Sequence, residues 1–390
     1  MNKKFVGVLI KRERLAKDWS QEGLCKGICA VSYLSKIEQG KTEASPEIVH
    51  LLLDRLDVCW YDDDLNCKQA GELVERLYDA IFSVDRTASE TASKDMDKHW
   101  EIYSKGPYML DFMILKAWIT DEEDSVLQEY EEYFDERQQT LWLLLHQKED
   151  EALRRNPSAF TYYYAGSTAY HYGNYPLALE RLQQSYRLAA EQGYAYIMLD
   201  SRLLIGNCYS NNMEFDRMQE HYKIATRLAN ALKDEASLED MKYNIASTSL
   251  ELGNVEESYA YFSKLKSPKP MALHKLAICY EKLGKTTEAL MTLDKIEIRN
   301  KGSLTKDLVL SMCNLVRYRL EHPNYLKDPA YGEMLLSCFD SIKSKLPSGY
   351  AGFHLPWVVE WYTATRQYKQ VYELLVDFPV CKILKPVKQD

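Results

Sequence analysis

Apolar side chains recur at helical spacing along most of the chain. Within residues 5–17, Val8, Leu9 and Leu15 fall on one side of a helix, and basic residues fall on the other. The same period continues from about residue 67 onward, with hardly any strand-like alternation. The pattern therefore predicts an all-α fold.

A pair of short helices follows the first one. Ser20 is suited to cap the earlier of the two, because its hydroxyl can accept a hydrogen bond from a free amide of the first turn. The later one, residues 31–39, carries Leu34 and Ile37 toward the core, and Gly40 ends it, since glycine adopts the left-handed conformation at little cost. This arrangement indicates a helix-turn-helix, whose second helix enters the major groove of DNA.

One more helix completes this N-terminal domain. Ser45 is a suitable cap and Pro46 suits the first helical position, so a helix over residues 47–56 is predicted. Residues 1–62 are thus expected to form one domain. The residues that this last helix should direct inward are Ile48, Leu51, Leu52 and Leu56.

The charge of the chain is divided unevenly. Its formal net charge is −9, yet residues 1–60 carry a net charge of about +2, so the remainder is strongly acidic. A basic excess confined to the N-terminal domain fits a small DNA footprint. Because each neutralised phosphate adds an increment of affinity, one copy should bind weakly, and a homodimer is expected.

A family resemblance rests on the N-terminal residues. These residues resemble the Xre/Cro-like domain, and more narrowly the version in the Rap–Rgg–NprR–PlcR–PrgX group of peptide-responsive regulators. The resemblance implies that Arg14 and Glu38 pair and fix the first helix against the third. The positions that carry it are Arg14, Ser20-Gln21, Leu24, 27–29 and 32–40. It implies double-stranded DNA as a partner, and the expected DNA-binding residues are Gln21, Ser32, Tyr33, Ser35, Lys36 and Lys41.

One position departs from the family pattern. Related sequences often carry a polar residue where this chain has Val31, whose side chain could still contact a thymine methyl group. The alternative interpretation is a small helical subdomain with solvated charges. The complete spacing of cap, turn, second cap and closing glycine favours DNA binding.

Internal repeats follow in the body of the chain. Small residues, glycines and aromatic residues recur in four tetratricopeptide-like units within residues 159–297. Flanking helical pairs are expected at 111–146 and 304–378. The predicted organisation is a connector helix and linker at 63–93, a ligand-sensing repeat domain at 94–320 and C-terminal repeats or a cap at 321–390. The fold class is therefore an N-terminal helix-turn-helix domain followed by a tetratricopeptide-type α-solenoid.

Stacked repeats of this kind form a concave groove. The first helix of each pair should line it, and asparagine suits a peptide backbone because its amide both donates and accepts. Tyrosine adds apolar area with a polar tip, and the chain holds 29 Tyr but ten Phe. Alternatively, the asparagines only cap helices or face solvent. The expected peptide-binding residues are Tyr163, Tyr170, His171, Asn207, Asn211, Tyr243, Asn244 and His274.

Three other segments have simpler interpretations. The polar stretch 87–93 is expected to be the linker after a helix at 66–88. The acidic runs 121–124 and 129–136 are expected to be solvated helix faces. The aromatic segment 350–378, with Trp357 and Trp361, is interpreted as core or a terminal cap, with a dimer contact as the alternative.

Several classes of protein are disfavoured. The N-terminus lacks the apolar core of a signal peptide, and no apolar run approaches the roughly 20 residues that span a membrane. Nine cysteines are scattered singly, which favours core thiols in a reducing cytosol over a metal site. No catalytic or cofactor motif is present. A cytoplasmic protein without cofactor, metal or enzymatic activity is therefore expected.

The resemblance implies a mechanism for the whole chain. A short secreted peptide, re-imported as a quorum-sensing pheromone, would occupy the groove and alter the dimer and its binding to DNA. Two alternatives remain open. The protein could be a repressor of mobile-element or phage type gated by a protein partner, or a tetratricopeptide scaffold without ligand-gated DNA binding.

Overall fold

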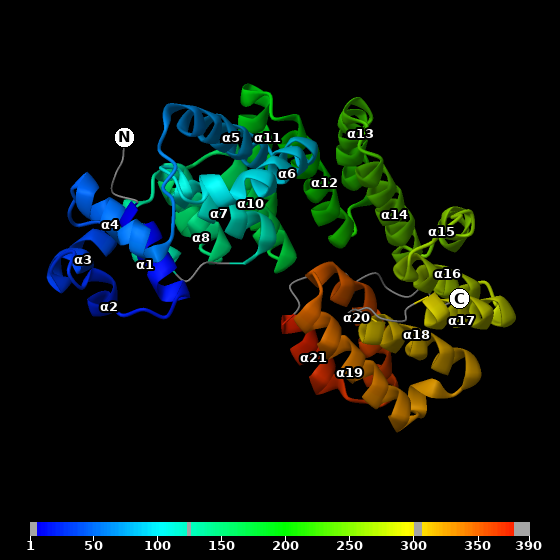
Figure 1. Ribbon diagram of the computed structural model, residues 1–390. Helices are drawn as coiled ribbons and strands as arrows, with labels where there is room; N and C mark the ends of the chain where they lie inside the picture. Colours follow the sequence, from blue (N-terminus) through cyan, green and yellow to red (C-terminus); the bar gives the residue numbers. More distant parts are fainter. Residues whose placement is uncertain (1–5, 123–125, 300–305, 378–390) are drawn as a thin grey trace. The chain divides into compact units, whose positions relative to one another are not determined.

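The computed structural model describes residues 6–122, 126–299 and 306–377. Every regular element within these ranges is a helix, which confirms the all-α prediction (Figure 1). The chain forms two compact units, residues 1–164 and 165–390. Among the described residues, no helix is both long and apolar enough to cross a membrane.

The first unit begins with a four-helix head, and its caps are the ones the sequence predicts. The Ser20 hydroxyl accepts from the Gly23 amide at 3.0 Å, and the Ser45 hydroxyl accepts from the Ile48 amide at 3.4 Å. Gly40 follows the third helix with φ +64°. The four helices are α1 (Val6–Ala16), α2 (Gln21–Cys25), α3 (Val31–Glu38) and α4 (Pro46–Leu56).

The core of the head lies between α1 and the other three helices. Gly7 allows α1 to approach α3 closely, since a Cβ atom there would collide with the carbonyl of Ile37. The prediction that Leu15 and Leu51 belong to the core is wrong, because each side chain is 50% exposed. In α1 the buried side chain next to Leu15 is that of Arg14. In α4 the buried side chains are those of Leu52, Leu53 and Leu56.

Seven more helical elements follow the head, and the last of them runs across the end of the first unit. The polar stretch 87–93 is not a linker, because it lies inside α6. The Asp85 carboxylate caps this helix by accepting from the Ala88 amide at 2.9 Å, and Ala92 and Met96 are buried where α6 packs on α5. The elements are α5 (Asp64–Phe82), α6 (Arg86–Tyr103), α7 (Met109–Thr120), η2 (Leu127–Tyr133), α8 (Glu136–Leu145), α9 (Glu149–Arg155) and α10 (Ala159–His171), which continues into the second unit.

The acidic run 129–136 differs from the prediction of a helix face in solvent. Residues 127–133 form the 3₁₀-helix η2, in which Leu127 and Tyr130 are buried while Glu129 and Glu132 stay exposed. Only part of the other acidic run can be assessed, since residues 123–125 lie outside the described residues.

The second unit is a series of antiparallel helix pairs. The four predicted repeats coincide with the pairs α10/α11, α12/α13, α14/α15 and α16/α17. Residues 304, 305 and 378 of the predicted flanking pair lie outside the described residues. The helices after α10 are α11 (Tyr175–Gln192), α12 (Ala195–Asn211), α13 (Phe215–Leu232), α14 (Glu235–Glu251), α15 (Val255–Phe262), α16 (Pro270–Lys282), α17 (Thr286–Arg299), α18 (Lys306–Glu321), η3 (Tyr325–Lys327), α19 (Pro329–Lys345), α20 (Ser348–Ala364) and α21 (Tyr368–Asp377).

Small residues permit the close pairing that the repeat pattern predicts. A Cβ atom on Gly206 would overlap the ring of Tyr222, so α12 and α13 can approach only with glycine there. A glycine with positive φ ends the first helix in three of the four pairs, and Met213 takes that conformation, with φ 60°, in the second. Contacts join α12 to α14, α14 to α16 and α16 to α18, so these four helices form one continuous row.

The C-terminal helices extend the core of this unit. Trp361 is buried against Gly332, and the Arg319 guanidinium lies 3.9 Å from the Trp357 ring centroid. The core interpretation is therefore confirmed for Trp361, while Trp357 is half-buried and packs against the core. The last helix, α21, instead exposes an apolar stripe made of Tyr368, Tyr372 and Val376.

Candidate DNA-binding head and repeat pocket

The outer side of α3 and the turn after it display most of the expected DNA-binding residues. Ser32, Lys36 and Lys41 are exposed, whereas Tyr33 and Ser35 are half-buried. Val31 joins this surface with 43% of its area exposed. This surface thus offers hydroxyl and ammonium groups, which can bind phosphates and base edges, and methyl groups, which can contact the methyl group of thymine.

A buried ion pair fixes this helix from behind. Arg14 donates to both carboxylate oxygens of Glu38, at 2.7 and 2.9 Å, and also donates to the carbonyl of Trp19 at 2.6 Å. The hydrogen bond with Glu38 raises the pKa of Arg14, so the guanidinium stays charged. The predicted pairing of Arg14 with Glu38 is confirmed, and it ties α1 to α3.

Gln21 has a different environment from the other members of the expected set. Its amide nitrogen donates to Glu38 at 2.8 Å, and the residue is half-buried. One of the two N–H groups of that nitrogen is therefore engaged inside the head, and the second N–H group and the amide oxygen are left for DNA. Gln21 therefore also positions α2 against the Glu38 carboxylate, which holds α3. This role was not assigned to Gln21 from the sequence.

Arg55 is a further positioning residue that sequence reading missed. From the last turn of α4, its guanidinium donates to the carbonyls of Leu24 and Lys26, at 2.8 and 2.6 Å. These carbonyls lie at the end of α2, where helical partners run out. The signal that the sequence offered for this role was a basic residue in the last turn of the final helix of the domain.

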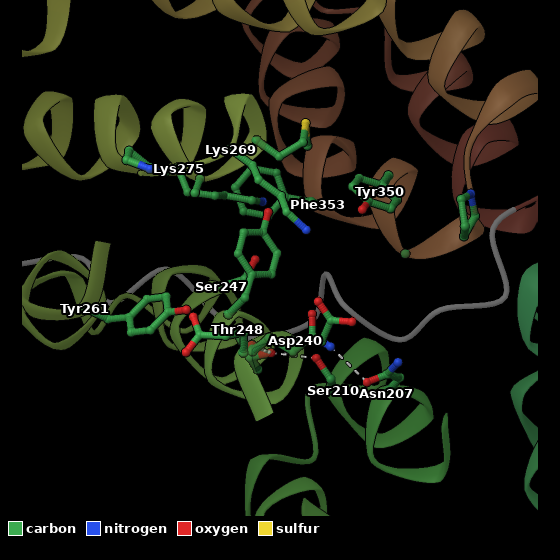
Figure 2. Close-up of a pocket in the computed structure, with 18 of the residues that line it drawn as sticks. Asn207, Ser210, Asp240, Ser247, Thr248, Tyr261, Lys269, Lys275, Tyr350 and Phe353 are labelled. Atoms are coloured by element: carbon green, nitrogen blue, oxygen red, sulfur yellow. Dashed lines mark hydrogen bonds between the residues drawn. The ribbon is translucent and has the colours of Figure 1, made fainter. Parts of the chain in front are cut away.

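The second unit contains a pocket of about 900 Å³. Most of its walls come from α12, α14, the turn before α16, α16 itself and the first two turns of α20, and single residues come from α10, α15 and α18 (Figure 2). Five of the eight expected peptide-binding residues line it: Tyr170, Asn207, Asn211, Tyr243 and Asn244.

Paired polar side chains cross the pocket between neighbouring repeats. Asn244 donates its amide to the Asn207 side-chain oxygen at 3.0 Å, and the Tyr222 hydroxyl donates to the same oxygen. The hydroxyls of Ser210 and Thr248 form a second bridge between α12 and α14 (Figure 2). Because the oxygen of Asn207 has two donors, its amide nitrogen is the group it can offer a ligand.

One hydroxyl in the pocket is unsatisfied. The Tyr243 hydroxyl is buried and has no hydrogen-bond partner among the described residues. Burial raises its pKa, so it remains a neutral donor. A buried polar group without a partner costs about 1–3 kcal/mol, so a ligand atom that accepts from it would recover stability.

The two sides of the pocket differ in charge. Helix α14 contributes only acidic charged side chains, namely Glu235, Glu239, Asp240 and Glu251, whereas Lys269 and Lys275 come from α16 and the residue before it. Lys275 is only 3% exposed, and its ammonium lies 2.6 Å from the Phe353 ring centroid, a cation–π contact.

The first turn of α20 closes the pocket against the early repeats. The Ser348 hydroxyl donates to the carbonyl of His171 at 3.0 Å, and Gly349 lies against the Asn211 side chain. Tyr350 and Phe353, which follow on α20, point into the pocket (Figure 2). Residues far apart in the sequence thus share one ligand-sized space.

Three expected peptide-binding residues lie elsewhere. Tyr163 is in the first unit, where its ring contacts that of Tyr164. His171 is exposed at the end of α10 and meets the pocket rim only through its carbonyl. His274 does not line the pocket, because its side chain is fully buried and its ring stacks on that of His354. Burial lowers the pKa of His354 to about 3, so that ring is neutral.

Other pocket residues were missed. Asp240 lies one turn before Tyr243 and Asn244 on α14, so helical spacing could have found it. Tyr350 and Phe353 come from a distant helix, and the repeat register gave no signal for them. In the part of the chain that is described, no group of three or more His, Cys, Asp or Glu side chains could hold a metal ion.

Comparison with known families defines the class of each part. Residues 10–58 match the helix-turn-helix family, and residues 271–299 match the tetratricopeptide repeat. The chain therefore carries an Xre-type helix-turn-helix domain followed by tetratricopeptide repeats, as predicted. Neither family is an enzyme family. A search of curated protein sequences found no match.

Solved structures extend the comparison to the fold. The crystal structure of Rap protein complexed with competence and sporulation factor has a TM-score of 0.61 at 13% identity, and the match covers 80% of this chain and 97% of that chain. This likeness shows a shared fold. Bacillus thuringiensis PlcR in complex with the peptide PapR7 and DNA matches over 75% of this chain and 99% of that chain at 15% identity, with a TM-score of only 0.28.

Proposed function

We propose that this protein is a cytoplasmic transcription regulator that binds DNA as a homodimer and is controlled by a short signalling peptide. The exposed side of α3 would read the operator, and the pocket between α12, α14, α16 and α20 would hold the peptide. The observation that carries the proposal is this pocket, lined by amide and hydroxyl groups, in a chain that also has a helix-turn-helix head.

The polar groups of the pocket suit a peptide main chain. Each peptide unit offers one donor and one acceptor. The amides of Asn207 and Asn244 and the Tyr243 hydroxyl can meet such groups without requiring one particular sequence. A pocket of about 900 Å³ lies within the roughly 300–1,000 Å³ typical of ligand sites, which supports a short ligand rather than a folded partner.

The charges of the pocket favour a ligand with both signs. The carboxylates of α14, such as Asp240, would attract an ammonium or guanidinium group, and Lys269 and Lys275 would attract a carboxylate. A short peptide with free termini carries both. The Rap protein, whose fold this chain shares, was solved with competence and sporulation factor, which supports a small signalling ligand here.

The head supports DNA binding that depends on two copies. Lys36 and Lys41 provide exposed ammonium groups for phosphates, but the basic excess of the head is small, so paired heads are needed for useful affinity. The exposed stripe of Tyr368, Tyr372 and Val376 on α21 is a candidate for the dimer contact. The eight described cysteines are free thiols, which supports a cytoplasmic location.

The test begins with selection of operator duplexes from random DNA by the full-length protein. Binding to the best duplex is then measured with and without a pool of synthetic heptapeptides that have free termini. A change in affinity that Asn244→Ala abolishes and Lys223→Ala, on exposed surface, leaves intact would support the proposal. Binding that no peptide changes would favour gating by a protein partner. Failure to select any duplex would favour a scaffold.

A further inference from the structure

The 3₁₀-helix η2 contacts the end of α3 within the first unit. The Tyr130 hydroxyl donates to the carbonyl of Glu38, and the Tyr133 hydroxyl donates to the carbonyl of Gln39 at 2.9 Å. Lys11 of α1 also forms an ion pair with Glu129. Three polar contacts therefore join one seven-residue segment to the head.

The two accepting carbonyls are the ones that the helix end leaves without partners. A helix ends with carbonyls that lack intrahelical donors. The carbonyls of residues 35–37 accept the amides of residues 39–41 at 2.9–3.1 Å. The next two carbonyls, of Glu38 and Gln39, accept the two tyrosine hydroxyls instead. The tyrosines thus complete the C-terminal cap of the recognition helix.

On its other side, η2 is held by the helical body. Leu127 is fully buried, and Tyr130 is 2% exposed, so burial raises the pKa of Tyr130 and keeps its hydroxyl a donor. Gln139 of α8 donates to Glu131 at 3.3 Å. A further contact runs from Arg12 of α1 to the carbonyl of Ser104, at 3.3 Å. The segment therefore connects α3 to the helices around α7 and α8.

We infer that Leu127–Tyr133 is a latch that fixes the orientation of α3 on the helical body, and that DNA binding is regulated by closing and releasing this latch. The inference rests on the proposed function, because the head must bind DNA. Paired recognition helices have to meet successive major grooves about one helical turn apart. A head held in one orientation meets that requirement, and a head that swivels does not. The latched head is thus the form that binds paired half-sites.

The contact itself is tested by hydrogen exchange in the full-length protein. Tyr130→Phe and Tyr133→Phe keep the rings and remove only the hydroxyls. Exchange of amides in residues 31–45 should become about fivefold faster for each hydroxyl removed, and roughly 25-fold faster in the double variant. The matched control is Tyr318→Phe, which removes a hydroxyl that donates to Asp328 at 2.6 Å in the second unit. It should leave exchange in residues 31–45 unchanged.

The regulatory role is tested with two DNA probes. One is the best duplex from a random-sequence selection with the wild-type protein, and the other is that duplex with one half-site scrambled. The double variant should bind the paired duplex at least tenfold more weakly and the scrambled duplex within twofold of wild type. Should Tyr130→Phe disturb folding, Glu129→Gln cuts the ion pair with Lys11 at an exposed position and should shift both readouts in the same direction.

The outcomes separate the latch from the proposed function. Unchanged exchange in residues 31–45 would overturn the latch, whatever the DNA result. Faster exchange with unchanged or tighter binding to the paired duplex would overturn its regulatory role. If the wild-type protein selects no duplex, the proposed function and the regulatory role both fail, while the exchange data still decide whether the contact holds α3.

Discussion

Replacing Glu38 by glutamine tests whether the buried ion pair holds the recognition helix. Glu38 is 2% exposed, and its carboxylate accepts three hydrogen bonds, two from Arg14 and one from Gln21. Glutamine keeps the shape but offers one acceptor and turns an NH₂ group toward donors. Arg14, only 7% exposed, would keep the carbonyl of Trp19 but lose its counter-charge.

The magnitude follows from the burial of both partners. Removing one member of a buried pair costs about 3–5 kcal/mol. Because Arg14 retains Trp19 and one amide oxygen, we expect the lower end, about 3 kcal/mol for Glu38→Gln. That is a large part of the roughly 5–15 kcal/mol that stabilises a domain.

The assay is native-state hydrogen exchange of peptides from the head, followed against urea concentration in the full-length protein. The control is the double variant Arg14→Met with Glu38→Leu, which removes both charges and should recover most of the lost stability. A loss below about 1 kcal/mol in Glu38→Gln would refute the reasoning. A double variant that is no more stable than the single one would refute it as well.

Four further predictions follow. Burial raises the pKa of Asp111 to about 6, so the folded state binds this proton more tightly than the unfolded state, and the stability from this group is lost as pH rises from about 4 to 6. Asp111→Asn should therefore add roughly 2–3 kcal/mol at pH 7 in urea denaturation and flatten that pH dependence. Gly206→Ala should lower stability by about 1–3 kcal/mol, seen as a lower Tm in calorimetry, because its Cβ meets Tyr222. Lys36→Ala should reduce the slope of log affinity against log salt by about 1. Tyr372→Ser should weaken the dimer in sedimentation equilibrium.

Each of these has a matched comparison. Asn retains the acceptor for Tyr78 and Gln138, at 3.1 and 2.8 Å from the Asp111 oxygen, so an unchanged pH profile in Asp111→Asn would contradict the burial argument. Gly23→Ala meets only the Ser20 hydroxyl at 3.3 Å and should cost less than Gly206→Ala. Lys148→Ala should leave the slope of log affinity against log salt unchanged. Lys369→Ala should leave the strength of the dimer unchanged. Equal effects in variant and control would count against the proposed contacts.

Much of the fold could be predicted because its signals are local. Ser20, Ser45 and Gly40 mark helix ends through hydrogen bonds and backbone angles within a few residues. The repeat boundaries were predictable because small residues mark the places where paired helices approach closely, as Gly166 and Gly206 do in the first two pairs. The pairing of Arg14 with Glu38 followed from the family resemblance and was confirmed.

The pocket was only partly predictable because its walls come from distant segments. The repeat register found Asn207 and Asn244, which lie on equivalent helices of successive repeats. It failed for His274, which is fully buried and stacks on His354, while its neighbour Lys275 is among the α16 residues that line the pocket. Tyr350 could not be found at all, because helix α20 reaches the pocket through tertiary packing.

The latch segment shows why an acidic run could be assigned to solvent and still hold a specific contact. In a 3₁₀-helix, residues three apart lie on the same side, one turn of about 6 Å along the axis. Tyr130 and Tyr133 are three apart, and their ring centroids are separated by 6.1 Å. An α-helix, with about 3.6 residues per turn, would rotate Tyr133 away from the line of Tyr130 by roughly 60°. The tighter helix brings both hydroxyls to the carbonyls of Glu38 and Gln39, while Glu132 between them remains in water. Restoring α-helical geometry in this segment would therefore break one of the two contacts without changing either tyrosine.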